Sequence, residues 1–333
     1  MLNTNSSLKQ YKSTKFFGSL LALSSCLVWS TSFALPYFLL TFEDILIVMA
    51  RYSIYGLLST CILLIKQRSF LKKISSHIWA MSFLWALLSN LLHYIGVIIS
   101  IRYATAPVTM VIIASTPIFV LIYANIKAKS LSIKSLLILS LLMSSGIILV
   151  NNAAIDWSFS SNSYLSYIIG LLGSLLSVVC TGLFVVYNEE FMKKHPEISS
   201  QQWSCLIGMS TFVLCFLTLI LGYTFNFIDF SIFANVSRKE LTKFIMITSL
   251  LGLGSSSLGT YLWIKASTLI SSLLLGALLI FETIFGLVLF FICKQELPSS
   301  TQFFGISLML SSCLYGFYAL RKPIIKHQTE KVL

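Results

Sequence analysis

The chain has 333 residues, of which 57% are hydrophobic and only 10% are charged, and its formal net charge is +12 at pH 7. Soluble domains carry about 25% charged residues, so this composition excludes an ordinary soluble enzyme. The positive charge does not indicate a nucleic-acid-binding protein, because the basic residues are spread over connectors and tails instead of forming one patch.

The apolar residues fall into ten blocks of membrane-spanning length. A helix crosses the bilayer core with roughly 20 apolar residues, and the chain leaves little room for anything else once ten such helices are drawn. The blocks cover residues 16–40, 44–65, 78–100, 105–126, 133–151, 163–187, 202–224, 241–263, 267–293 and 301–320. We therefore predict an all-α membrane protein with ten transmembrane helices.

The lysines and arginines between the blocks predict the orientation. With the N-terminus inside, the inner segments hold seventeen of them, the outer segments hold five, and Arg51 lies within a block. The five outer residues are Arg102, Arg238, Lys239, Lys243 and Lys294. Because cytoplasmic connectors retain basic residues, both termini are expected in the cytoplasm, as tails over residues 1–15 and 321–333.

A polar connector from Asn151 to Asn162 divides the blocks into five and five. Five is odd, so two related halves, residues 1–151 and 152–333, would lie upside down relative to one another, as in many secondary transporters. A shift of 166 positions supports such a repeat, because it aligns Ile118-Phe119 with Ile284-Phe285, Leu131 with Leu297, and Ser145 with Ser311.

Several short motifs accompany this layout. They are Val28-Trp29-Ser30-Thr31, Met49-Ala50-Arg51-Tyr52, Ala114-Ser115-Thr116-Pro117-Ile118-Phe119, Phe281-Glu282-Thr283, Lys294-Gln295-Glu296-Leu297 and Gly305. Together they resemble the drug/metabolite transporter superfamily, in its ten-helix EamA-type branch, over nearly the whole chain. The resemblance implies two inverted five-helix repeats around a central cavity and transport by alternating access. Thr283 and Ser130 depart from the family pattern, which usually has Pro and often has Glu there, and the missing Pro removes the usual reason for a kink in the ninth helix.

Four polar side chains from three of the predicted helices share one depth in the membrane. Counted at 1.5 Å per residue, Arg51 and His93 lie roughly 10 Å from the outer surface, and Asn90 and Glu282 roughly 15 Å. An ionisable side chain at a helix centre costs roughly 2.5–3.5 kcal/mol. We therefore expect these groups to face the interior of the bundle.

Glu282 is the strongest candidate for the substrate or coupling site. We expect it to bind a proton, a cation or a positively charged substrate, and the alternative is a structural ion pair with Arg51. For Arg51 we expect a structural or gating role, with its head reaching the outer surface or Asp44. His93 is a candidate proton relay, although a lone histidine in a helix more often packs.

Two aromatic side chains lie well inside the predicted helices. Trp29 and Tyr94 are candidates for stacking on a flat ring or for holding a cation, with packing as the alternative. Small residues recur at four-residue spacing in two stripes, Gly173, Ser177 and Thr181, and Gly252, Ser256 and Thr260. We expect both stripes to allow close helix packing, or else to leave room for a cavity.

No catalytic or nucleotide-binding motif occurs in the chain, and its seven cysteines include no CxxC pair. We expect no enzyme activity, no cofactor and no metal. The predicted function is a secondary transporter or exchanger in a bacterial inner membrane, powered by a gradient or by exchange, with a homodimer possible.

A carboxylate with inward aromatic side chains suits a cationic metabolite that carries a ring. S-adenosylmethionine is the first substrate candidate, with S-adenosylhomocysteine as a possible counter-substrate, since the superfamily includes such carriers in host-dependent bacteria. The composition, rich in Ser, Phe and Ile, is typical of an AT-rich genome. The alternatives are an amino-acid or drug exporter of the same superfamily and, from another class, a membrane-embedded enzyme or lipid-handling protein.

Overall fold

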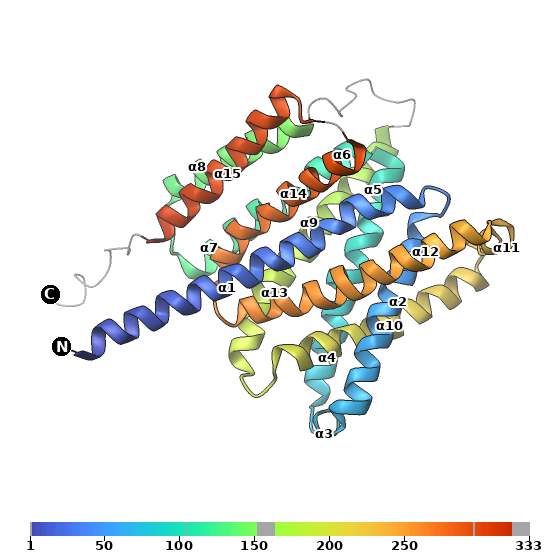
Figure 1. Ribbon diagram of the computed structural model, residues 1–333, viewed down its shortest axis with the longest axis horizontal. Helices are drawn as coiled ribbons and strands as arrows, with labels where there is room; N and C mark the ends of the chain where they lie inside the picture. Colours follow the sequence, from blue (N-terminus) through green and yellow to red (C-terminus); the bar gives the residue numbers. More distant parts are fainter. Residues whose placement is uncertain (1, 105, 152–163, 296, 322–333) are drawn as a thin grey trace.

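The structure is a computed structural model that describes residues 2–104, 106–151, 164–295 and 297–321. Glu296, most of the connector between the predicted halves and residues 322–333 of the C-terminal tail lie outside the described residues. The described chain is helical and contains no strand (Figure 1). The helices are α1 (Leu2–Ala34), η1 (Leu35–Leu39), α2 (Asp44–Lys66), α3 (Arg68–Leu71), α4 (Ser76–Trp85), η2 (Ala86–Leu92), α5 (His93–Ala104), α6 (Ala106–Ile113), α7 (Thr116–Ala128), α8 (Ile133–Asn151), α9 (Tyr164–Lys194), α10 (Ser200–Thr224), α11 (Ile232–Asn235), α12 (Arg238–Leu250), η3 (Leu251–Gly259), α13 (Thr260–Ser267), α14 (Ser272–Lys294) and α15 (Ser300–Arg321).

Among the described residues, ten helical spans are long and apolar enough to cross a membrane. In chain order they are α1 with η1, α2, α4–η2–α5, α6 with α7, α8, α9, α10, α12–η3–α13, α14 and α15. This confirms the predicted all-α class and the ten spans. The start of α1 and the end of α15 lie on the same side of the bundle (Figure 1), and we call that side the inner end.

Serine side chains begin four of the spans. The hydroxyls of Ser75, Ser199, Ser237 and Ser271 accept hydrogen bonds from backbone N–H groups in the first turns of α4, α10, α12 and α14. Those N–H groups have no partner within the helix, and a serine cap satisfies one of them. The serine-rich connectors therefore fix where these spans start.

Two of the spans contain a π-helical segment. Residues 86–92 form η2 in the third span, and residues 251–259 form η3 in the eighth. The shift of 166 positions that suggested an internal repeat places residues 86–92 at 252–258, within η3. Because π-helical turns are rare and are frequent at functional sites, their matching positions support a relationship between the two halves.

The fourth and ninth spans end in the same way. Lys129 follows α7 with φ 49°, and Gln295 follows α14 with φ 56°. Both are left-handed caps of a kind that ends many helices, and the shift of 166 positions places one on the other. The two spans differ at their centres, because α6 and α7 are separated at Ala114 and Ser115, whereas α14 runs unbroken through Thr283.

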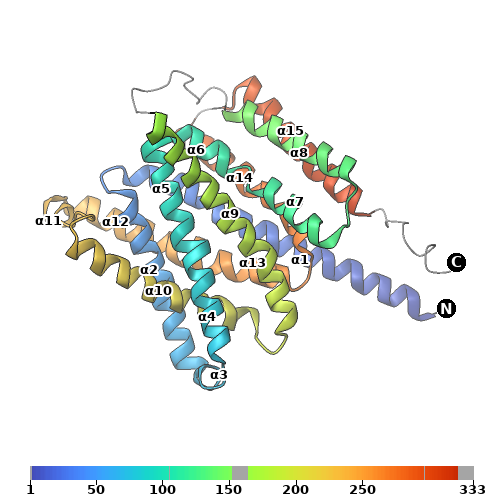
Figure 2. The same cartoon turned by 180° about the vertical axis from the view of Figure 1, so that it is seen from behind.

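The same pairs of spans are in contact when spans one to five are swapped, in order, with spans six to ten. The fifth span packs on the tenth (α8 and α15), the second on the seventh (α2 and α10) and the fourth on the ninth (α7 and α14) (Figure 1, Figure 2). The third span packs on the sixth (α5 and α9), and the corresponding pair, the eighth and the first, is also in contact (η3 and α1). Likewise, the first span packs on the ninth (α1 and α14), and the corresponding sixth span packs on the fourth (α9 and α7). Two related halves would produce this arrangement.

Glycine pairs allow two of these helix pairs to approach closely. A Cβ atom added to Gly96 would lie 2.5 Å from the carbonyl oxygen of Gly173, and one added to Gly146 would lie 2.7 Å from that of Gly305. Larger residues would push α5 from α9 and α8 from α15, since small residues set the distance between membrane helices. The packing role predicted for Gly173 is confirmed.

Candidate functional site

Three serine hydroxyls hold the guanidinium group of Arg51 in the middle of the bundle. Its Nε donates to Ser256 Oγ at 2.7 Å. Its Nη1 donates to Ser32 Oγ at 3.0 Å, and its Nη2 to Ser255 Oγ at 3.3 Å. The guanidinium also lies 5.0 Å from the ring centre of Tyr52. Arg51 thus links α2 to α1 and η3.

The local fold of η3 explains why Arg51 finds these partners. A Cβ atom on Gly252 would lie 2.7 Å from the carbonyl oxygen of Arg51, so only glycine lets η3 approach α2 this closely. Ser255 and Ser256 are 0% and 2% exposed, and buried hydroxyls require a hydrogen-bond partner. Arg51 makes no ion pair with Asp44 or with any other described residue, so its expected reach to Asp44 is not observed.

The carboxylate of Glu282 has no polar partner among the residues that the structure describes. The residue is half-buried in the middle of α14, and the carboxylate makes no hydrogen bond or ion pair with the described part of the chain. Among the described residues, the fully buried side-chain polar atoms without a hydrogen-bond partner are Nε1 of Trp85 and Nε1 of Trp263, so the oxygens of Glu282 are not fully buried. The carboxylate is therefore unpaired among the described residues and not fully buried.

Arg51 and Glu282 interact through space without forming an ion pair. The charge of Arg51 acts on the Glu282 carboxyl group, on His93 and on Tyr94. Glu282 of α14 and His93 and Tyr94 of α5 therefore lie within electrostatic range of Arg51 of α2. This part of the bundle, which we call the polar region, thus contains an acid without a partner among the described residues and a cation that contacts three hydroxyl groups and the Tyr52 ring.

Two hydroxyl groups of α9 fix the His93 ring. Its Nδ1 lies 2.6 Å from Ser177 Oγ and 2.8 Å from Thr181 Oγ1, and its ring lies edge-on to Tyr94 at 6.3 Å between centres. The stripe that begins at Gly173 thus supplies hydrogen bonds as well as close packing. These contacts position the imidazole ring beside the polar region.

Asn90 and Trp29 make their main contacts within the bundle. Asn90 lies in η2, and its Nδ2 donates to Thr211 Oγ1 of α10 at 2.7 Å. Trp29 stacks at a tilt on Trp263, with ring centres 5.0 Å apart, and covers Gly259, where a Cβ atom would lie 2.5 Å from its ring. Both residues join neighbouring spans, and both remain partly accessible.

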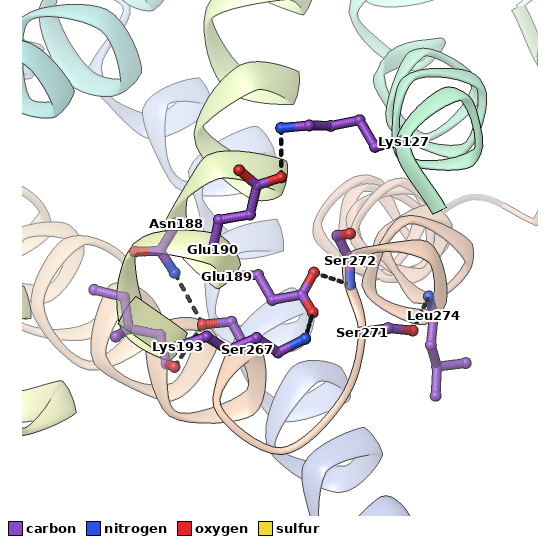
Figure 3. Close-up of polar contacts among 10 residues, drawn as sticks. Lys127, Asn188, Glu189, Glu190, Lys193, Ser267, Ser271, Ser272 and Leu274 are labelled. Atoms are coloured by element: carbon purple, nitrogen blue, oxygen red, sulfur yellow. Dashed lines mark hydrogen bonds and ion pairs between the residues drawn. The ribbon is translucent and has the colours of Figure 1, made fainter. Parts of the chain in front are cut away.

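A second polar group, which the sequence analysis missed, lies at the inner end of α9. Glu189 accepts a hydrogen bond from the backbone N–H of Ser272 at 2.6 Å and pairs with Lys193. The next residue, Glu190, pairs with Lys127 of α7 (Figure 3). These carboxylates tie α9 to the start of α14 and to the end of α7.

Asn188 completes this group, which we call the α9 polar cluster (Asn188, Glu189, Glu190 and their partners). Its Nδ2 donates to Ser267 Oγ at 2.9 Å, and its Oδ1 accepts from Trp203 Nε1 at 2.9 Å. Asn188 is 0% exposed. The cluster was missed because the sixth block was ended at residue 187, whereas α9 continues to Lys194. Three consecutive polar residues at the end of an apolar block were the available signal.

Comparison with known proteins relates the chain to a bacterial inner membrane protein. No family model matches it. It is 24% identical over 321 residues to the "Inner membrane protein YtfF" of Escherichia coli (strain K12), an alignment that covers 94% of this chain and 99% of that protein. A solved structure described only as "Crystal structure of protein" has a TM-score of 0.72 at 16% identity and covers 91% of this chain and 98% of its own.

These similarities confirm the coarse predictions. The protein is a multi-pass membrane protein homologous to an inner membrane protein. The solved structure shows that the fold is shared and carries no information about function. The resemblance to the EamA-type branch remains a prediction.

Proposed function

We propose that this protein is a secondary transporter that carries a small cationic metabolite by alternating access. The observation that carries the proposal is the carboxylate of Glu282 in the middle of α14, which is not fully buried and has no partner among the described residues. A charged side chain at this depth costs roughly 2.5–3.5 kcal/mol on the insertion scale. Binding of a cation from solution offsets that cost, and a purely structural carboxylate would be expected to have a partner.

The helix arrangement supports the alternating-access mechanism. In this proposal the halves, residues 1–151 and 152–333, are inverted repeats that move against each other around a central cavity containing Glu282. Three features favour this relationship. They are the helix pairing that persists when the halves are swapped, the matching π segments and the matching left-handed caps. The α9 polar cluster ties α7, α9 and α14 together at the inner end, so it would close that end while the substrate site is open to the other side.

S-adenosylmethionine is the first substrate to test. Its sulfonium and amino groups are positive, as Glu282 requires, and its adenine ring is a partner for the partly accessible rings of Trp29 and Tyr94. S-adenosylhomocysteine, which lacks the sulfonium charge, is a suitable counter-substrate because it would leave the carboxylate more readily. An amino-acid or drug exporter is the alternative within the same mechanism.

The direct test is counterflow in proteoliposomes. Purified protein is reconstituted with S-adenosylmethionine, amino acids or cationic drugs inside, and uptake of the labelled compound is measured. The proposal expects counterflow of a cationic compound by the wild type, a loss of at least about tenfold in Glu282→Gln, and no loss in Glu43→Gln, a matched exposed acid. A compound that emerges chemically altered would favour the membrane-enzyme alternative, and counterflow of a cation by Glu282→Gln at the wild-type rate would refute the assigned role of Glu282.

A further inference from the structure

A basic hollow lies against one face of α12, near the outer end of the bundle. Its volume is about 450 Å³, and its lining residues are Arg238, Lys239, Thr242, Lys243, Met246 and Ile247. They recur at helical spacing, so they share one face of the helix. Figure 1 shows α12 at the edge of the bundle beside α11. Arg238, Lys239 and Met246 are exposed, so the hollow is open to the outside of the bundle.

The charge of the hollow is strongly positive. Arg238 and Lys239 are exposed and pair with no acidic side chain in the described part of the chain. Lys243 pairs with Glu240, whose Oε1 lies 3.9 Å from Lys243 Nζ. Thr242 does not supply a free hydroxyl proton, because its Oγ1 donates to the carbonyl oxygen of Arg238 at 2.8 Å. An anion would therefore be held by the cationic side chains.

Basic residues on the predicted outer side are an exception within the chain. On the predicted orientation, five lysines and arginines lie in the outer segments, and three of them line this hollow. Basic residues are otherwise kept on the cytoplasmic side. Their presence here points to a specific negative ligand on the outer side.

The hollow also lies at the level of the lipid headgroups. The last turn of α10 and the connector that follows it expose Tyr223, Phe225 and Phe227, which are 72%, 70% and 59% exposed. Aromatic side chains of this kind mark the membrane interface. Further along α12, Met246 and Leu250 are 67% and 58% exposed. A ligand at this place therefore meets cationic groups at the interface and apolar groups directly below.

We propose that the hollow binds an anionic phospholipid. Arg238, Lys239 and Lys243 hold the phosphate, since arginine and lysine are the usual cationic partners of phosphate groups. An acyl chain lies along Met246 and Leu250. The helix α12 continues directly into η3, whose Ser255 and Ser256 bind Arg51 of α2. A bound headgroup therefore fixes the outer half of the eighth span.

The test is lipid binding to the full-length protein by native mass spectrometry. Phosphatidylglycerol and phosphatidylcholine are titrated onto the wild type, Lys239→Gln and the triple variant Arg238→Gln/Lys239→Gln/Lys243→Gln. Since each basic residue near a membrane surface contributes about fivefold to the attraction, we expect about fivefold weaker phosphatidylglycerol binding in the single variant and about 100-fold in the triple variant. Arg102→Gln, another outer basic residue, should bind like the wild type.

Three results would overturn the proposal. They are unchanged phosphatidylglycerol binding in both hollow variants, an equal loss in Arg102→Gln, and equal affinity for phosphatidylcholine. Soluble glycerol phosphate distinguishes a lipid headgroup from a free phosphate compound as the ligand. We expect that it does not displace the lipid, and complete displacement would make the hollow a site for free phosphate compounds. Since the substituted side chains are surface-exposed or half-buried, the single variant also tests the idea if the triple variant is poorly produced.

Discussion

Arg51 and Glu282 are the two charged residues that lie deepest in the outer half of the bundle, and their hydrogen bonding differs. Arg51 donates to three hydroxyl groups from two neighbouring spans, whereas the Glu282 carboxylate accepts from none of the described residues. Bound hydroxyls fix a cation in place but do not neutralise it. We therefore assign Arg51 to holding the helices together and Glu282 to ligand binding.

Arg51→Ala should weaken the protein without abolishing substrate affinity. It leaves the buried hydroxyl of Ser256 without its donor, whereas Ser255 keeps the hydroxyl of Ser32 at 2.7 Å. An unsatisfied buried polar group costs about 1–3 kcal/mol. We expect a lower thermal midpoint in detergent and slower exchange, with measurable substrate binding retained. A well-folded Arg51→Ala protein that binds no substrate would instead place Arg51 in the substrate site.

Residue by residue, the sequence predicted which groups lie deep but not what each one contacts. Glu282 and Arg51 stood out because each interrupts an apolar block. The helical spacing of 3.6 residues predicted that Ser256 shares a face with Gly252 and Thr260, but η3 is π-helical and its hydrogen bonds skip one further residue. Ser255 and Ser256 therefore both reach Arg51, which an α-helical pattern does not suggest.

At the scale of the helices, the close crossings make a clear prediction. Gly96→Ala places a Cβ atom 2.5 Å from the carbonyl oxygen of Gly173 and forces α5 away from α9. Overpacking of this kind costs about 1–3 kcal/mol, so the thermal midpoint should fall. Gly254→Ala is the control, because its nearest neighbouring atom would be 3.8 Å away, and a similar loss in both variants would argue against a specific crossing.

The α9 polar cluster predicts a charge-swap rescue at the inner end. Lys127→Glu places two carboxylates together where Lys127 now pairs with Glu190 and lies 4.1 Å from the centre of the Tyr187 ring. The pair is partly exposed, so it contributes only about 0.2–1 kcal/mol, and repulsion should be the larger effect. Counterflow should slow severalfold in Lys127→Glu and recover in Lys127→Glu/Glu190→Lys, and a double variant as slow as the single one would exclude a pairwise role.

The beginnings of the spans were easier to predict than their internal irregularities. The apolar blocks were visible in the sequence, and the spans follow them with shifts of a few residues, whereas the serine caps were found in the structure. The π segments η2 and η3 were not predicted, because a π turn arises from packing against neighbouring helices and leaves no simple mark on composition. Thr283 did predict the unbroken α14, since the proline that would kink the helix is absent.

On the scale of the whole molecule, the charge distribution predicts the orientation. Reporter fusions after Lys73 and at the C-terminus should both give a cytoplasmic signal, because seventeen of the lysines and arginines fall on that side and five on the other. An even number of spans places the two termini on one side. An external signal from either fusion would overturn the orientation and the inner position of the α9 polar cluster together.

The arrangement of the halves depends on contacts that a sequence alone does not supply. The sequence predicted five spans on each side of a polar connector, and the shift of 166 positions proved to relate η2 to η3 and Lys129 to Gln295. The pairing of α5 with α9 and of η3 with α1 joins residues far apart in the chain. The packing of η3 on α1 and α2, and of α1 on α14, brings together the helices that carry Arg51 and Glu282.

The measurement that tests the central claim most directly is equilibrium binding of labelled S-adenosylmethionine and other cationic metabolites to wild-type and Glu282→Gln protein. Gln keeps the shape and hydrogen-bonding capacity of the side chain, so the comparison isolates the charge. We predict that the wild type binds a cationic compound, that Glu282→Gln at equal yield and thermal stability loses at least about tenfold in affinity, which is about 1.4 kcal/mol, and that neutral analogues are unaffected. Equal affinity of both proteins for the cationic compound would contradict the account, because Glu282 would then be structural.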